Sequence, residues 1–137
     1  MMGAAGRATV QLSARLKGRK VVVFALPGAF TGPCSTAHIP SFIRTADAFR
    51  AKGVEEIICI SVNDPFVLKA WGEATGATKA GITHLGDADG AMTKELKLEF
   101  TAPHIGLIGR SNRYAALIED GIITRLNLDK PGECNIS

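Results

Sequence analysis

The chain has 137 residues, of which 46% are hydrophobic and 21% are charged, and its formal net charge is +3. This length suits one hydrophobic core, so we expect residues 1–137 to form a single domain. The composition is that of a soluble globular protein, with no apolar run long enough to cross a membrane, and the net charge is too small to indicate nucleic-acid binding.

The positive charge is concentrated near the N-terminus, because the first 46 residues contain six Lys or Arg and neither Asp nor Glu. Arg-rich segments that lack acidic residues are typical of transit peptides. Only residues 1–8 are available for such a signal, because the chain soon continues into a predicted apolar strand. We therefore expect a cytoplasmic protein, with a mitochondrial or plastid location as the alternative.

The first strong structural signals are two continuous apolar runs, residues 21–26 and 57–62. Each is typical of a parallel strand buried on both faces. Between them, apolar residues recur with helical spacing over 39–49, and Gly53 follows where a helix C-terminus often has glycine. The pattern predicts a strand–helix–strand unit, which is nearly always right-handed.

Five further elements are predicted in chain order: a helix over 65–74, a strand over 82–85, a helix over 91–98, and strands over 114–118 and 122–128. Asp64 and Pro65 provide the cap and the first position of the helix over 65–74. Asp120-Gly121 is a turn signal between the last two strands. Together these elements predict an α/β fold in which α-helices flank a central mixed β-sheet.

The three cysteines form neither a CxxC nor a zinc-ligand pattern, and an odd number does not favour a disulfide framework. We expect no metal site. Cys34 stands out because it follows the first predicted strand and opens the next helix. Ligands of open α/β sheets bind beyond the carboxyl ends of the strands, and a helix N-terminus lowers the pKa of a thiol. Cys34 is therefore the candidate nucleophile.

Residues 27–35 read Pro-Gly-Ala-Phe-Thr-Gly-Pro-Cys-Ser. The pattern Pro-x-x-x-Thr-x-x-Cys resembles the peroxidatic motif of peroxiredoxins, and the longer run resembles their type II (atypical two-cysteine) branch. Similar stretches recur in the same order along the chain: His38-Ile39-Pro40, Ser61-Val62-Asn63-Asp64, Trp71-Gly72, Arg113-Tyr114 and Glu119-Asp120-Gly121. The resemblance implies a thioredoxin-like fold and a thiol-dependent peroxidase that needs no cofactor.

The resemblance also implies the roles of four residues. Cys34 would attack hydrogen peroxide or an alkyl hydroperoxide as a thiolate and become a sulfenic acid. Thr31 would hold the peroxide, Pro27 would shield the thiolate from water, and Arg113 would stabilise the thiolate and orient the peroxide. From the residues alone, Thr31 is a candidate N-cap, a role compatible with the catalytic one, and the preferred interpretation of Arg113 is a surface arginine paired with Asp120.

The thiol that resolves the sulfenic acid is open between three candidates. Cys59, 25 positions after Cys34, lies where part of the type II branch has a proposed resolving cysteine, although a mid-strand cysteine is ordinarily inert. Cys134 resembles the position that other members use. The third candidate, which we favour slightly, is an external thiol such as glutaredoxin, glutathione or thioredoxin.

The sequence departs from the family pattern in the order Gly32-Pro33 before the nucleophile, where Thr-Pro-x-Cys is usual, and in shortened N- and C-terminal elements. A non-catalytic redox-sensing or binding module that uses Cys34 is the alternative function. Phe30 and Trp71 are either core residues or part of a homodimer surface. His38, four residues after Cys34, is interpreted as a structural helix residue, with a catalytic base as the alternative.

Overall fold

The computed structural model describes residues 1–3, 11–31 and 38–129, apart from the side chain of Met2. Six described strands form one sheet: β1 (Met2–Gly3), β4 (Ile82–Gly86), β3 (Glu56–Ser61), β2 (Lys20–Ala25), β7 (Tyr114–Glu119) and β8 (Ile122–Leu128), in that spatial order. β2, β3 and β4 run parallel, whereas β1, β7 and β8 each pair antiparallel to a neighbour. The predicted mixed sheet is confirmed.

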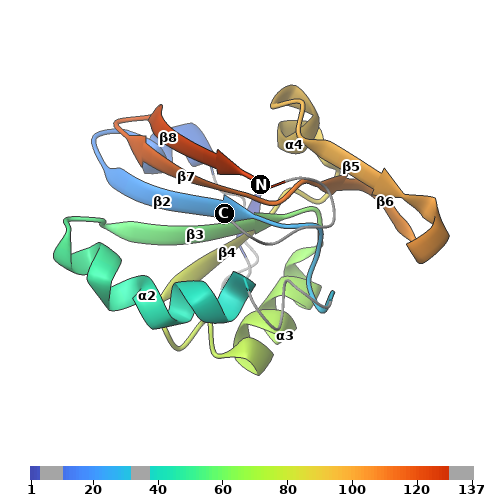
Figure 1. The fold of residues 1–137 in the computed structure, drawn as a ribbon, viewed down its shortest axis with the longest axis horizontal. Coiled ribbons are helices and arrows are strands. Elements are labelled where there is room, and N and C mark those ends of the chain that lie inside the picture. Colours follow the sequence, from blue (N-terminus) through green and yellow to red (C-terminus); the bar gives the residue numbers. More distant parts are fainter. Residues whose placement is uncertain (4–10, 32–37, 130–137) are drawn as a thin grey trace.

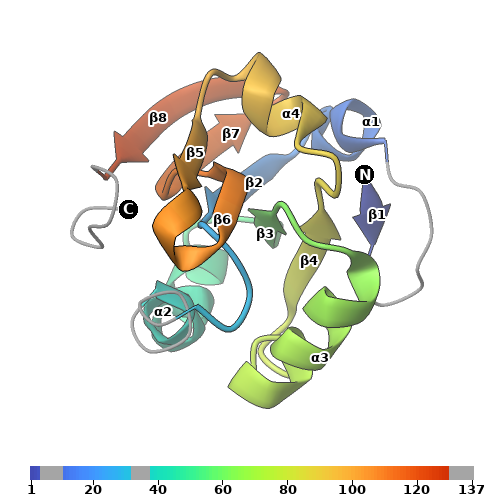
Figure 2. The same ribbon diagram turned by 90° about the vertical axis from the view of Figure 1, so that its right-hand side faces the viewer.

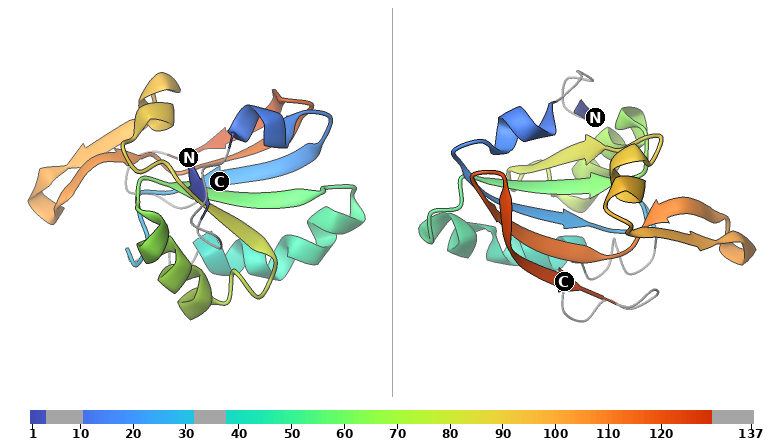
Figure 3. Two further views of the ribbon diagram at one scale, coloured as in Figure 1. Left: turned by 180° about the vertical axis from the view of Figure 1, so that it is seen from behind. Right: turned by 90° about the horizontal axis from the view of Figure 1, so that it is seen from above.

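Helices cover both faces of this sheet. The helices α2 (Ile39–Ala51) and α3 (Pro65–Thr75) lie on one face (Figure 1), and the short helix α1 (Leu12–Leu16) lies on the other (Figure 3). No helix in the described ranges is long and apolar enough to cross a membrane.

The central strand β2 divides the core into two clusters because its successive side chains point to opposite faces. Val22 and Phe24 pack with residues of α2 and α3, whereas Val21 and Val23 pack with Leu16 of α1. All five side chains are buried. This two-sided burial explains why the strand is a continuous apolar run in the sequence.

The predicted helix ends are confirmed where their chemistry is local. The Asp64 carboxylate accepts a hydrogen bond from the Val67 N–H at 2.9 Å and so caps α3, and Pro65 is the first residue of that helix. The helix α2 ends at Ala51, and Gly53 follows with a φ of +88°. That conformation lies in the left-handed region that favours glycine.

The hairpin between β7 and β8 is also confirmed. Its two turn residues, Asp120 and Gly121, have φ values of +51° and +77°, and Glu119 pairs with Ile122 across the turn. Positive φ at both central residues matches the right-handed twist of paired strands.

One predicted helix is shorter than expected, and one hairpin is new. The helix α4 (Ala91–Glu95) ends early because Lys97 adopts a φ of +59°, which is incompatible with a helix. The chain then forms β5 (Glu99–Ala102), a 3-10 turn η2 (Pro103–Ile105) and β6 (Leu107–Ser111), which pair as a separate two-stranded sheet. This hairpin projects from the main sheet (Figures 1 and 2).

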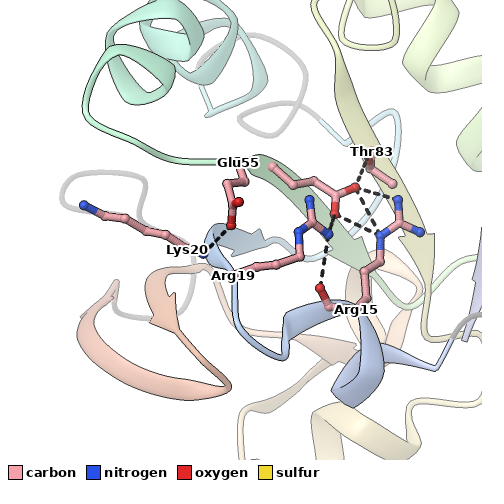
Figure 4. A network of polar contacts seen from close by, with 6 residues as sticks. Arg15, Arg19, Lys20, Glu55 and Thr83 are labelled. Carbon is pink, nitrogen blue, oxygen red and sulfur yellow. Dashed lines mark hydrogen bonds and ion pairs between the residues drawn. The ribbon is translucent and has the colours of Figure 1, made fainter.

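A network of ion pairs and hydrogen bonds around one largely buried carboxylate joins α1 to the main sheet. Figure 4 shows Arg15, Arg19 and Thr83 around one carboxylate, that of Glu56. Arg15 donates to this carboxylate at 2.6 and 2.9 Å, Arg19 donates at 2.9 Å, and the Thr83 hydroxyl donates at 2.8 Å. Glu56 begins β3, so the network lies at the amino ends of the parallel strands.

Candidate active site

The loop that follows β2 lies at the carboxyl ends of the parallel strands. Its residues 27–31 are held partly by their own backbone, because the Thr31 hydroxyl donates a hydrogen bond to the Gly28 carbonyl at 2.7 Å. A second bond crosses to the segment that follows β3, where the Asn63 side-chain oxygen accepts from the Ala29 N–H at 3.0 Å. Pro27 is half-buried at the start of the loop.

Phe30, within this loop, has an unusual backbone. Its φ is +61°, and its side chain is 58% exposed. A bulky residue in the left-handed region costs on the order of 1 kcal/mol, and it persists only where the surroundings fix the chain. The loop conformation is therefore imposed by its contacts rather than by local preference.

Arg113 reaches the same edge of the sheet from the other direction. Because β7 runs antiparallel to β2, Tyr114 pairs with Ala25, and the residue before Tyr114 lies beside the start of the loop. The Arg113 side chain is only 5% exposed, and its Nη1 lies 2.7 Å from Nδ1 of His38. His38 is the residue that immediately precedes α2.

The alternative in which Arg113 is a surface arginine paired with Asp120 is wrong. Arg113 is buried, and the two residues flank opposite ends of a six-residue strand, which separates them by roughly 20 Å. Asp120 instead accepts a hydrogen bond from the Gly18 N–H.

His38 is a neutral imidazole. Burial and then the positive charge of Arg113 lower the pKa of His38 to about 3, against a smaller opposing effect of Asp129. Its ring is 1% exposed and packs against Phe24 and Phe42, with centroid distances of 5.1 and 5.4 Å. A group with so low a pKa is a poor acceptor of a thiol proton at neutral pH, so the geometry favours the structural interpretation of His38.

The predicted site residues fall into two groups. Pro27, Thr31 and Arg113 all lie at the carboxyl edge of the sheet, whereas Cys59 lies in the middle of β3, fully buried and paired in register with Phe24. Cys34 and Cys134 lie outside the described residues, as does the predicted start of the helix at Cys34.

Two residues of this edge were missed by sequence reasoning. Asn63 follows a predicted strand, and ligands of open α/β sheets bind beyond the carboxyl ends of the strands. Its position could therefore have identified it as a candidate site residue. Arg110 lies three positions before Arg113 and donates from Nη1 to the Pro27 carbonyl at 3.3 Å. No sequence pattern indicates that the hairpin carrying Arg110 folds back onto the loop.

Comparisons with known proteins identify the family. The model of the redoxin family matches residues 2–135. Peroxiredoxin-2B of Arabidopsis thaliana is 43% identical over 129 residues, which cover 94% of this chain and 79% of that protein. The chain belongs to the peroxiredoxin family. Its curated relatives are type II plant peroxiredoxins, and peroxiredoxins are thiol-dependent peroxidases.

Other relatives differ in length and location. Mitochondrial peroxiredoxin-2F of Arabidopsis thaliana is 45% identical over 122 residues, which cover 89% of this chain but only 60% of that protein. A chloroplastic form from Oryza sativa is 44% identical over 126 residues, which cover 90% of this chain and 56% of that relative. This peroxiredoxin chain thus spans little more than half the length of its organellar relatives.

Solved structures confirm the thioredoxin-like fold of the peroxiredoxins. Reduced Prx3 from Vibrio vulnificus, in complex with hydrogen peroxide, superposes with a TM-score of 0.88 at 44% identity and covers 93% of this chain and 82% of that one. Peroxiredoxin 5 from Alvinella pompejana superposes with a TM-score of 0.79 at 35% identity, covering 86% of this chain and 75% of that one.

Proposed function

We propose that this chain reduces hydroperoxides with a thiol as the electron donor, and that Cys34 is its nucleophile. One observation carries the proposal: Arg113, a buried cation, is held by His38 four residues after Cys34 in the chain. A cation at this edge favours a thiolate over a thiol. We also propose that residues 1–137 form one domain, which is supported by the family match over 2–135.

The cycle consumes two external thiols for each peroxide and releases them as a disulfide, and the leaving oxygen takes up one proton. The Cys34 thiolate attacks one peroxide oxygen, an S–O bond forms, the O–O bond breaks, and the leaving oxygen takes a proton to become water or an alcohol. The sulfur is oxidised to sulfenic acid. A thiol then displaces its hydroxyl as water to give a disulfide, and a second thiol restores the thiol form of Cys34.

The described residues supply the surroundings of this reaction. In the proposed mechanism the Thr31 hydroxyl, which donates to the Gly28 carbonyl, has lone pairs that accept a hydrogen bond from the peroxide. The donors of Arg113 stabilise charge on the departing oxygen. Pro27 covers the approach to the sulfur. The peroxide bound to the relative Prx3 supports a peroxide as substrate.

The test is continuous peroxide consumption with dithiothreitol as reductant. Cys34→Ser is expected to abolish turnover, whereas the matched Cys59→Ser and Cys134→Ser variants retain it, because dithiothreitol replaces any resolving thiol. Full turnover by Cys34→Ser would overturn the proposal. If the wild type consumes one equivalent and stops, the chain is a sensor and the alternative function is correct.

Two further substitutions test the assisting residues. Thr31→Val removes the hydroxyl at nearly constant volume, and Thr31→Ser restores it. Arg113→Met removes the buried charge. Thr31→Val and Arg113→Met are each expected to lower kcat/KM for peroxide about a hundredfold, the usual effect of removing one hydrogen-bonding group that stabilises a transition state. Values of Thr31→Val and Arg113→Met within twofold of wild type would remove these residues from the proposed mechanism.

We propose that an external thiol, rather than Cys59, resolves the sulfenic acid. Cys59 is fully buried in β3, so a bridge from Cys34 to Cys59 requires that strand to open. Mass spectrometry after one equivalent of peroxide without reductant distinguishes the cases. A Cys34 sulfenic acid is expected, whereas a Cys34–Cys59 or Cys34–Cys134 bridge would assign an internal resolving thiol.

We propose a homodimer and a cytoplasmic location, with a mitochondrion or plastid as the alternative location. Phe30, Phe66 and Ile108 are 58%, 63% and 69% exposed, and such apolar side chains suit an interface. Trp71 is fully buried, so its interpretation as an interface residue is wrong. Sedimentation of the wild type and of Phe66→Ser tests the dimer, and fractionation tests the location.

A further inference from the structure

We propose that Arg110 and Asn63 are positioning residues, which clamp the loop of Pro27 and Thr31 in the geometry that peroxide reduction requires. The inference rests on the proposed peroxidase function. The two side chains reach the loop from different parts of the fold, Arg110 from the projecting hairpin and Asn63 from the segment between β3 and α3. Both bind backbone atoms of the loop.

The first half of the clamp is Asn63. Its side-chain oxygen accepts from the Ala29 N–H at 3.0 Å, a bond between segments 34 residues apart. The backbone of Asn63 packs closely against the end of β4, because a Cβ placed on Gly86 would lie 2.5 Å from the Asn63 carbonyl oxygen. Asn63 therefore connects the middle of the loop to the main sheet.

The second half is Arg110. Its Nη1 donates to the Pro27 carbonyl at 3.3 Å and lies directly over Gly28, where an added Cβ would come within 2.5 Å of it. Within the parts of the chain that the structure describes, Arg110 has no carboxylate within ion-pair distance, so its guanidinium is directed at the loop and not at an acidic side chain.

The requirement for a clamp follows from the loop's own backbone. Phe30 adopts a φ of +61° between the clamped residues and Thr31, and a bulky residue leaves that region unless its neighbours are fixed. If the loop relaxed, the Thr31 hydroxyl would move with it. A displacement of about 1 Å between reacting groups lowers a rate about a hundredfold, so the clamp acts through position and not through contact with the peroxide.

Gly28 provides a test that leaves the arginine in the sequence. Its φ lies outside the left-handed region, so the backbone accepts alanine, but the new methyl group would push the Arg110 guanidinium off the Pro27 carbonyl. Gly28→Ala and Arg110→Met should therefore lower kcat/KM for hydrogen peroxide by the same factor. In the double variant the added methyl group meets no guanidinium, so the two losses should not multiply.

The experiment measures kcat/KM for hydrogen peroxide with the full chain. Arg110→Met and Gly28→Ala are each expected to lower it about tenfold, Arg110→Lys to recover part of the loss, and the double variant to match Arg110→Met within twofold. The exposed Arg125→Met is the matched control and should equal wild type. Every variant should remain folded, with a urea midpoint close to that of the wild type, because neither Gly28 nor Arg110 belongs to the two core clusters and a single hydrogen bond contributes only a small part of the free energy of unfolding.

The outcomes separate the clamp from the proposed function. A wild type without peroxidase activity would overturn the proposed function. An active wild type with Arg110→Met at unchanged kcat/KM, or with losses that multiply in the double variant, would overturn the clamp alone. Asn63→Ala gives a second arm that leaves Arg110 intact, and it is expected to lower kcat/KM by a similar factor while the protein stays folded, with a fall in the urea midpoint no larger than one lost hydrogen bond explains.

Discussion

The guanidinium of Arg113 and the imidazole of His38 form a hydrogen bond whose direction is fixed by chemistry. Arg113 Nη1 lies 2.7 Å from His38 Nδ1, and a guanidinium can only donate, so Nδ1 is the acceptor and the ring proton is on Nε2. Protonation of His38 would place two cations against each other inside the protein. The pair thus holds a buried positive charge at the loop that carries the peroxidatic motif.

The first prediction concerns this acceptor. His38→Leu removes one partner of a buried charged donor, and we expect it to lower the free energy of unfolding by about 1–3 kcal/mol. His38→Gln supplies a carbonyl oxygen and should recover part of the loss. Urea unfolding followed by the fluorescence of Trp71, the only tryptophan, measures both variants, because this residue is fully buried in the folded protein. Equal stability of His38→Leu and wild type would contradict the prediction.

The second prediction is a loss of stability in mild acid. Burial lowers the pKa of His84 to about 4, and His38 has a pKa of about 3. Both lie below the unfolded value of about 6.5, so between pH 6.5 and 4 the unfolded chain binds more protons than the folded protein. Stability therefore falls as the pH falls through this window, by about 2 kcal/mol for each histidine at pH 5.

A variant separates the contribution of His84 to this pH dependence. His84 packs edge-on against Trp71, and neither ring nitrogen has a hydrogen-bond partner among the described residues. His84→Leu should therefore remain folded at pH 7 and lose about half of the difference in stability between pH 7 and pH 5. The comparison of urea midpoints at the two pH values checks this, and an unchanged difference would show that His84 is solvated or already charged.

The elements predicted correctly from the sequence are those with a local cause. The strands β2 and β3 are apolar because they are buried on both faces, and the β7–β8 turn needs the Asp120-Gly121 conformation. The hairpin of β5 and β6 was missed because the alternation of exposed and more buried residues in β5 extends over only four residues, a run too short to stand out beside the predicted helix that precedes it. A long-range bond, from the Asn112 N–H to the Leu98 carbonyl at 2.7 Å, helps to fix its base.

The candidate site, too, could be predicted from the sequence only where the cause is local. The motif and the family resemblance indicate Pro27, Thr31 and Arg113, but the local sequence Asn112-Arg113 suggests a surface residue. Arg113 is buried because the antiparallel register of β7 carries it to the end of β2, and because α2 brings His38 to meet it. Both causes depend on chain segments about 75 to 90 residues away, which no local pattern reports.

The third prediction tests the cap of α3. The Asp64 carboxylate accepts from the Val67 N–H at 2.9 Å, and this N–H belongs to the first turn of the helix, where no helical carbonyl is available. Asp64→Ala should lower the free energy of unfolding by about 1 kcal/mol, whereas Asp64→Ser, which retains a cap oxygen, should lower it less. Urea unfolding at pH 7 measures both, and an Asp64→Ala variant as stable as the wild type would show that the cap contributes nothing.

The last prediction concerns Glu56, at the opposite end of the strands from the candidate site. Burial alone would raise the pKa of Glu56, but hydrogen bonds from Arg15 and Thr83, together with the charge of Arg15, hold it below its ordinary value of 4.5. A lowered pKa means that the ionised network stabilises the fold fully above about pH 4.5 and loses that contribution as the pH falls through the folded value.

Glu56→Gln should therefore lower the free energy of unfolding at pH 7 by about 1–3 kcal/mol, because two arginines lose a charged acceptor. Arg15 and Arg19 are each about one-third exposed, so water replaces part of that partner and keeps the loss moderate. The deficit should shrink as the pH falls from about 4.5, the pKa of the unfolded chain, toward the lower pKa of the folded protein, below which the wild-type carboxylate is itself protonated. Peroxide turnover should be unchanged, since the network and the Pro27 loop lie at opposite ends of β2 and β3. A deficit that is constant with pH would show that the network depends on shape and hydrogen bonding and not on charge.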